Sequence, residues 1–292
     1  MKRKIFIKLI GGIGNQLFQY SCAKNLAIEL DANLIIDDKS GFFFDKKFKR
    51  KKSLPKNLNY IKINFIDLIL FNLFLLVKKI FYQKKFYLIF GERIIIDETK
   101  SKKFIKNFFK ITKKSKIIYL NGFFQSEKYF AQNKKIIISK ILQNKITNKK
   151  INKLQKLISK KSVCIGVRMF EEAPEVIRFN FGGIENFKFY NKSIQFFKKR
   201  IFKANFFIFS TLKNTKLLSQ KINVKAKILN KTYGDNDDMN FLLLMTKFSN
   251  FIISNSSFYW WGSYLASYKK NIKIVASKKF TNINTIPKIW KN

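Results

Sequence analysis

The sequence predicts an α/β protein, because three stretches each combine an apolar strand-like run, a turn of small or polar residues, and a helical pattern. They lie at 4–30, 117–130 and 251–265. Strands that alternate with helices are typical of parallel sheets with helices packed against their faces. With 292 residues, 47% of them hydrophobic, the chain can form one large domain or two of ordinary size.

The first stretch contains a glycine-rich turn. A strand-like run at 4–10 leads directly into GGIGNQ, and a helix is predicted at 17–30. Glycines at a strand end let the backbone approach a phosphate or sugar closely, and Asn15 and Gln16 add side-chain donors. The spacing does not match the dinucleotide fingerprint, which needs a glycine two places after Gly14. Taken alone, this turn is weak evidence for a ligand loop.

The most apolar segment of the chain lies at 65–77. It has thirteen residues, interrupted by Asp67 and Asn72, whereas a spanning helix needs about 20. We therefore expect it not to cross a membrane. Lysines and aromatic residues follow it at 78–87 and leave two interpretations open. We favour a helix buried in the core over one that lies on an anionic membrane face.

Other short apolar runs predict further strands, which lie at 33–38, 117–120, 163–167, 205–210 and 226–229. Lysine alternates with isoleucine and leucine across 131–161, which indicates one or two connecting helices. We place the boundary between two α/β halves there, giving 1–155 and 156–292.

The strand at 163–167 leads directly into Arg168, and an unusual concentration of acidic residues follows. Three of the chain's seventeen acids are Glu171, Glu172 and Glu175. An arginine at a strand end can hold a pyrophosphate through charge-assisted hydrogen bonds, with a surface ion pair as the alternative. In a chain without histidine, a carboxylate is the natural candidate for a general base. We weigh this role of the glutamates equally with a role as counter-ions for nearby arginines.

The third stretch runs from an apolar strand into the polar turn SNSS at 254–257 and then into an aromatic helix. Helix-start N–H groups and hydroxyls at the carboxyl end of a strand suit a phosphate group. An ordinary capped helix with buried tryptophans is the alternative. The aspartates at 235–238 precede a further helix at 239–245, and we favour a helix cap over a divalent metal site for them.

Composition excludes several classes of protein. The net charge of +43 comes from lysines spread along the whole chain, without an RNA-binding or zinc-finger signature, so we expect no nucleic-acid partner. The absence of histidine excludes Ser-His-Asp and Cys-His catalysis and His-ligated metals. Two cysteines, Cys22 and Cys164, are too few for a disulfide framework and indicate a reducing cytoplasm. The start of the chain is interpreted as a strand and not as a signal peptide.

Four segments, in this order, resemble glycosyltransferase family 11, the α-1,2-fucosyltransferases of bacterial surface glycans and of animals. They lie at 11–27, at 121–130, at the strand with Arg168 and at 237–266, and together they span nearly the whole chain. The resemblance implies a GT-B-like fold, in which two Rossmann-type α/β halves face a central cleft. It places the acceptor on the first half and the nucleotide sugar on the second.

The resemblance also implies GDP-fucose as the donor, a galactoside hydroxyl as the acceptor, and inversion without a metal or another cofactor. The expected partners are thus a sugar nucleotide and a glycan acceptor, with a lipid-linked acceptor and peripheral contact with an anionic membrane as further options. We expect an enzyme of surface-polysaccharide synthesis, such as O-antigen of lipopolysaccharide, in the cytoplasm or on the inner face of the cytoplasmic membrane.

The strand with Arg168 departs from the family pattern His-x-Arg-Arg-Gly-Asp. Arg168 is kept, but Gly166 stands for the histidine, Met169 for the second arginine, Phe170 for the glycine and Glu171 for the aspartate. Three alternatives follow: fucosyl transfer, transfer of another activated sugar on the same fold, and a non-catalytic glycan-binding protein.

These considerations predict a site with two groups of residues and no metal ligands. The predicted catalytic residues are Arg168, Glu171, Glu172 and Asn15. The predicted donor-binding residues are Gly11, Gly12, Gly14, Asn15, Arg168, Ser210, Asn255, Ser256 and Ser257.

Overall fold

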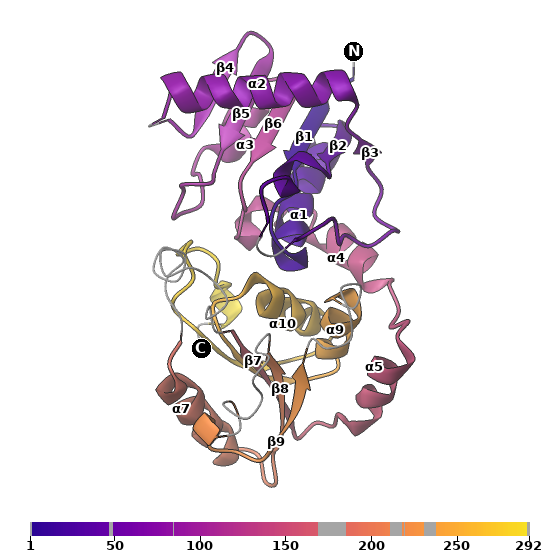
Figure 1. Ribbon diagram of the computed structural model, residues 1–292, viewed down its shortest axis with the longest axis vertical. Helices are drawn as coiled ribbons and strands as arrows, with labels where there is room; N and C mark the ends of the chain where they lie inside the picture. Colours follow the sequence, from indigo (N-terminus) through magenta and orange to yellow (C-terminus); the bar gives the residue numbers. More distant parts are fainter. Residues whose placement is uncertain are drawn as a thin grey trace. The chain divides into compact units, whose positions relative to one another are not determined.

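The protein, as a computed structural model, folds into two compact units, each with its own sheet (Figure 1). The residues that the structure describes are 2–46, 49–83, 85–168, 185–210, 218, 220–230 and 238–290. Unit 1 comprises Met1–Ile141 and Asn282–Thr285, and unit 2 comprises Leu142–Thr281 and Ile286–Asn292.

Unit 1 is built on a six-stranded sheet in the order β3-β2-β1-β6-β5-β4, in which only the β4–β5 pair is antiparallel. Its strands are β1 (Lys4–Lys8), β2 (Asn33–Asp37), β3 (Ile61–Lys62), β4 (Tyr87–Phe90), β5 (Arg93–Asp97) and β6 (Ile117–Asn121). The chain moves from β1 to β2 on one side and reaches β6 on the other. The strand order therefore reverses between β1 and β6, where open α/β sheets bind ligands.

Helices cover this sheet. They are α1 (Ile13–Glu29), α2 (Phe65–Phe81), α3 (Phe108–Thr112) and α4 (Lys134–Leu142), with short 3-10 turns η1 (Ser40–Phe42) and η2 (Glu127–Tyr129). α1 contacts β1 and β2. α2 runs across the sheet (Figure 1), and its Phe71 and Leu75 pack on Phe6, Ile95 and Tyr119 from three strands.

Unit 2 is built on a five-stranded parallel sheet in the order β11-β10-β7-β8-β9. Its strands are β7 (Ser162–Val167), β8 (Asn205–Ser210), β9 (Ala226–Asn230), β10 (Asn250–Ile253) and β11 (Lys273–Ala276). Its helices are α5 (Lys149–Leu154), α7 (Phe187–Lys198), α9 (Asp238–Met245) and α10 (Ser257–Lys269), with η3 (Gln155–Leu157) and η5 (Lys288–Trp290). All of β7 is buried, as expected for a central strand covered on both faces.

The two Rossmann-type α/β halves expected from the sequence are confirmed, and each predicted strand is present within a residue or two. The sequence-based boundary near residue 155 falls after α5, whereas α5 belongs to unit 2. A contact explains this placement, because the backbone N–H of Thr147 donates to Asn240 Oδ1 of α9 at 2.7 Å. Cys22 and Cys164 are free and buried, and burial raises the pKa of both thiols.

The interpretation of the apolar segment at 65–77 as a buried core helix is wrong for one face of α2. Only Phe71, Leu75 and Lys78 of this helix are buried. Its opposite face exposes seven large apolar side chains. Within the described ranges, no helix combines the length and apolar character needed to span a bilayer.

Gly166, the fifth of the six residues of β7, has no room for a side chain. An added Cβ would lie 2.4 Å from Cγ of Tyr259, whose hydroxyl is held 3.0 Å from the carbonyl oxygens of Val167 and Phe209. We expect Gly166→Ala to lower the free energy of unfolding by about 1–3 kcal/mol through overpacking, measured by urea denaturation. Gly12→Ala is the control, since its Cβ would meet nothing within 4 Å. Equal losses in both variants would contradict this packing account.

Candidate functional site

In unit 2 three neighbouring strands end close to those predicted donor-binding residues that belong to this unit. β7 leads into Arg168, and its neighbour β8 ends at Ser210, which pairs with Val167. On its other side β10 leads into the turn at 254–257. The strand order reverses between β7 and β10, so this edge is the switch point of the unit 2 sheet.

The turn after β10 presents the start of α10 at this edge. The N–H of Ser254 donates to the carbonyl of Gly166 at 3.1 Å, and the N–H of Ser256 donates to that of Ser254 at 2.8 Å. Ser256 is the N-cap residue, and its hydroxyl makes no capping bond. Asn255 Nδ2 donates to the carbonyl of Lys279 at 3.0 Å and so ties the turn to the segment after β11. A helix start with these hydroxyls favours an anion.

Two buried tyrosines lie near Arg168. The Tyr259 hydroxyl bridges the carbonyls at the ends of β7 and β8. Burial raises the pKa of Tyr259 far above its usual value, while the positive charge of Arg168 opposes this rise. Tyr190 lies beside the Arg168 backbone and the Ser254 hydroxyl, and burial raises its pKa as well. Both phenols therefore stay neutral, and half-buried Arg168 supplies positive charge at the switch point.

In unit 1 the glycine turn lies at the carboxyl end of β1. Gly11 has a φ of +78°, and an added Cβ would lie 2.4 Å from Asn15 Nδ2. Gly12 is the N-cap of α1 and accepts from the N–H of Asn15 at 2.9 Å. Gly14 is buried inside the first turn of the helix. Only Gly11 and Gly12 thus form the loop itself.

Asn15 joins the loops that follow β1 and β6. Its side chain is half-buried, and its Oδ1 accepts from Gln125 Nε2 at 2.8 Å. Gln16 is buried, and its amide bonds the carbonyls of Gly11 and Lys51 at 2.9 Å and the N–H of Ser53 at 2.7 Å. The prediction of Gln16 as a ligand donor is therefore corrected, because its side chain holds the loop instead.

The sequence analysis missed Glu98, which directly follows β5 and is only 3% exposed. Its Oε2 accepts from the N–H groups of Phe123 and Phe124 at 2.9 and 3.0 Å. Burial raises the pKa of this carboxyl to about 7, against the lowering effect of these hydrogen bonds. Glu98 thus fixes the loop after β6 that also carries Gln125. Two carboxylates directly after the apolar run at 94–96 are the signal that could have indicated it.

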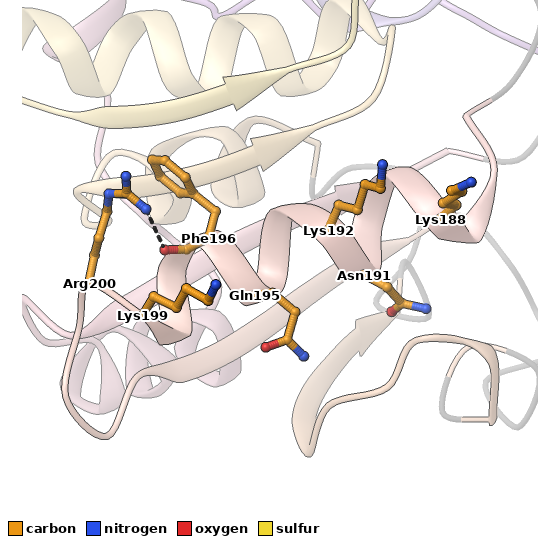
Figure 2. A pocket seen from close by; sticks show the side chains of 7 residues that line it. All are labelled: Lys188, Asn191, Lys192, Gln195, Phe196, Lys199 and Arg200. Atoms are coloured by element: carbon orange, nitrogen blue, oxygen red, sulfur yellow. Dashed lines mark hydrogen bonds between the residues drawn. The ribbon is translucent and has the colours of Figure 1, made fainter.

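A shallow hollow in unit 2 lies on the outer helix α7, and none of these residues lines it (Figure 2). It is lined by Lys188, Asn191, Lys192, Gln195, Phe196, Lys199 and Arg200. The Arg200 guanidinium lies 3.7 Å from the centre of the Phe196 ring. The side chains all come from one helix and its end, and none is a predicted site residue. This hollow is therefore a solvated basic helix face.

The remaining predicted residues, Glu171 and Glu172, lie outside the described residues. Asp238 begins α9, while its neighbours at 235–237 also lie outside them. In the part of the chain that the structure describes, no three acidic, cysteine or histidine side chains gather closely enough to hold a metal ion.

Two Rossmann-type units with polar switch points define an α/β protein with the fold that many nucleotide-binding proteins use. The model of glycosyl transferase family 11 matches residues 4–285. The chain therefore belongs to glycosyltransferase family 11 and is a glycosyltransferase.

One curated relative and two solved structures are similar to this chain. An alpha-1,2-colitosyltransferase from Escherichia coli is 27% identical over 294 residues, which cover 94% of this chain and 92% of the relative. A mutant of Arabidopsis thaliana FUT1, solved in complex with GDP, has a TM-score of 0.53 at 11% identity. The match covers 94% of this chain and 70% of the FUT1 chain. Fucosyltransferase NodZ from Bradyrhizobium has a TM-score of 0.48 at 12% identity, and the match covers 94% of this chain and 96% of the NodZ chain. The FUT1 similarity shows the shared fold.

Glu98 leads to a pH-dependent prediction. Its pKa is about 7 in the folded state against an ordinary value of 4.5 for a glutamate in water, so between these values only the folded state keeps the proton. Stability is therefore lost as the pH rises through this window, by at most about 3 kcal/mol. Glu98→Gln keeps the acceptor oxygen and removes the titration. We expect urea unfolding to show a smaller loss of stability between pH 4.5 and 7 in this variant.

The exposed Glu92 provides the control for this experiment. Glu92→Gln is expected to keep the pH dependence of the parent protein. If Glu98→Gln also kept it, the raised pKa of the buried carboxyl would be refuted.

Proposed function

We propose that this glycosyltransferase moves fucose from GDP-fucose to a galactoside hydroxyl and forms an α-1,2 linkage. The observation that carries the proposal is the meeting of Arg168 with the 254–257 turn at the β7–β10 switch point. A guanidinium beside a helix start suits the diphosphate of a nucleotide sugar. GDP in the FUT1 complex and the α-1,2 linkage in the name of the E. coli relative support this choice.

In the proposed mechanism, charge that develops on the leaving GDP is stabilised by Arg168 and the first N–H groups of α10. Preorganised donors of this kind lower the barrier because they need no rearrangement as the bond breaks. This assignment leaves no step that requires a metal ion or another cofactor. The unit 2 part of the proposed donor site also includes Ser210, Asn255, Ser256 and Ser257.

The acceptor hydroxyl attacks the anomeric carbon from the face opposite to GDP, which inverts its configuration. A carboxylate takes the hydroxyl proton, and Glu171 and Glu172 are the proposed bases. We assign Asn15 and the turn of Gly11 and Gly12 to the donor sugar at the reaction centre. In this proposal Gly14 contributes through the packing of the α1 start.

The proposed setting is the synthesis of a bacterial surface polysaccharide, such as O-antigen, with a lipid-linked acceptor at the inner face of the cytoplasmic membrane. The large positive charge of the chain supports this setting, because it attracts an anionic lipid surface.

A second donor is favoured by one observation, the match to a colitosyltransferase. Colitose is fucose without one ring hydroxyl. A site that binds this hydroxyl through hydrogen bonds rejects the deoxy sugar strongly, whereas an apolar site discriminates only weakly. The substitutions around Arg168 that distinguish this chain from the family pattern are consistent with either sugar.

Replacement of Arg168 tests the assigned diphosphate site. We expect Arg168→Ala to lower the release of GDP from the donor by about 100-fold or more, since a charge-assisted contact in the transition state is lost. Arg200→Ala removes an arginine that lies just after the outer helix α7 and should leave GDP release unchanged. A rate for Arg168→Ala within a few-fold of the parent rate would show that the assignment is wrong.

A panel of sugar nucleotides tests the donor. The purified protein should release GDP from GDP-fucose selectively, faster with a galactoside acceptor, and equally well with a chelator present. Preference for GDP-colitose would move the assignment to the second donor. If no donor turned over with any galactoside, the non-catalytic glycan-binding alternative would be supported instead.

A further inference from the structure

Helix α2 is fixed on unit 1 by contacts along its inner side. Phe71 and Leu75 enter the core cluster over the sheet. Lys78 Nζ lies 3.3 Å from Asp97 Oδ2, and both side chains are 5% exposed. Nearer the helix start, Lys8 Nζ donates to Asn72 Oδ1 at 2.5 Å. A buried ion pair and a packed core contact set the rotation of the helix about its axis. The identity of the residues on its outer side is therefore determined.

That outer side is apolar along the full length of the helix. We define the α2 outer face as Phe65, Ile66, Ile69, Leu73, Leu76, Ile80 and Phe81, which are 50–74% exposed. Monomeric soluble proteins rarely expose continuous apolar patches of more than a few hundred Å², and such patches mark protein or membrane contacts.

The hairpin of β4 and β5 continues this surface. The Phe90 ring lies 6.2 Å from the ring of Phe74 on α2, centre to centre. Phe90 is 64% exposed, and Phe86 is also exposed at the start of the hairpin. Aromatic side chains at the border of an apolar patch are typical of proteins that contact the interfacial region of a membrane.

Charge determines which occupant fits. From 61 to 93 the chain has six basic residues and two acidic ones, and Lys79, Lys85 and Arg93 are exposed. The whole chain carries a formal charge of +43. We propose that the α2 outer face, with the adjoining hairpin, docks on an anionic lipid bilayer. This inference concerns a surface of unit 1 and is independent of the sugar that the enzyme transfers.

The proposed binding mode places α2 parallel to the bilayer plane. Seventeen residues of helix extend for about 25 Å, and the inner side stays packed on the sheet. The apolar side chains enter the region between head groups and acyl chains, while the flanking lysines and arginine contact lipid phosphates. The spacing of Ile66, Ile69, Leu73, Leu76 and Ile80 would also suit a second copy of the helix. Two chains that each carry a charge of +43 repel each other, which opposes that arrangement. The same charge favours contact with an anionic bilayer.

Flotation with lipid vesicles tests the proposal with the charge held constant. The test variant carries Ile69→Gln, Leu73→Gln and Leu76→Gln. The control variant removes three exposed apolar side chains elsewhere and carries Phe44→Gln, Ile136→Gln and Phe202→Gln. Vesicles of phosphatidylglycerol with phosphatidylcholine are compared with phosphatidylcholine alone, at low and at high salt.

We expect the parent and the control variant to bind the anionic vesicles, and the test variant to bind at least about tenfold more weakly, most clearly at high salt. GDP release with a water-soluble acceptor should be equal in all three proteins. Circular dichroism and this activity establish that the test variant is folded.

Two outcomes overturn the proposal. In the first, the test variant binds as tightly as the parent, which would mean that net charge alone causes binding. In the second, the parent does not bind vesicles but sediments as a dimer that the test variant converts to a monomer, which would assign the face to a second copy of the chain. Loss of GDP release from all three proteins would instead count against the proposed function and leave the vesicle result unaffected.

Discussion

The candidate donor site depends on the buried side chain of Tyr259. Its hydroxyl lies 3.0 Å from the carbonyl oxygens that end β7 and β8, and its ring fills the space beside Gly166. One residue in the first turn of α10 thus fixes two strand ends relative to the helix start. Because Arg168 follows β7 directly, the same contact determines where the guanidinium can reach. The glycine at 166, which replaces the histidine of the family pattern, is required by this packing, since any side chain there would displace the tyrosine.

Both units hold their switch point together through polar side chains, but the residue types differ. In unit 1, amides perform the task that Tyr259 performs in unit 2. Gln19 accepts from the N–H of Ile10 at 3.1 Å and donates to the carbonyl of Gly122 at 2.9 Å, which joins the loops after β1 and β6. Asn15 and Gln125 add a second bond between these loops. In both units the chain thus stiffens the switch point of its sheet with buried polar contacts, and a preformed site needs less rearrangement when a ligand binds.

Much of this arrangement could be predicted from the sequence, and the exceptions have physical reasons. Central parallel strands are continuous apolar runs, so β7, β8 and β10 were identifiable, and their carboxyl ends located Arg168, Ser210 and the 254–257 turn. The exposure of α2 was not predictable, because two of its polar residues, Asn72 and Lys78, lie on the covered side and contact Lys8 and Asp97 there, so the polar pattern of the helix indicates the wrong side as exposed. The role of Gln16 was misjudged and Glu98 was missed, because tertiary contacts decide what both side chains do. Whether a polar side chain meets ligand or backbone depends on loops distant in the sequence, here at 51–53 and 123–124.

The central claim is that the nucleotide is held by the switch point of unit 2, and a crystal structure of the protein with GDP tests it most directly. The account predicts the diphosphate within hydrogen-bond distance of the Arg168 guanidinium and of the first N–H groups of α10. GDP bound instead at the turn of Gly11 and Gly12, with no density beside Arg168, would contradict it.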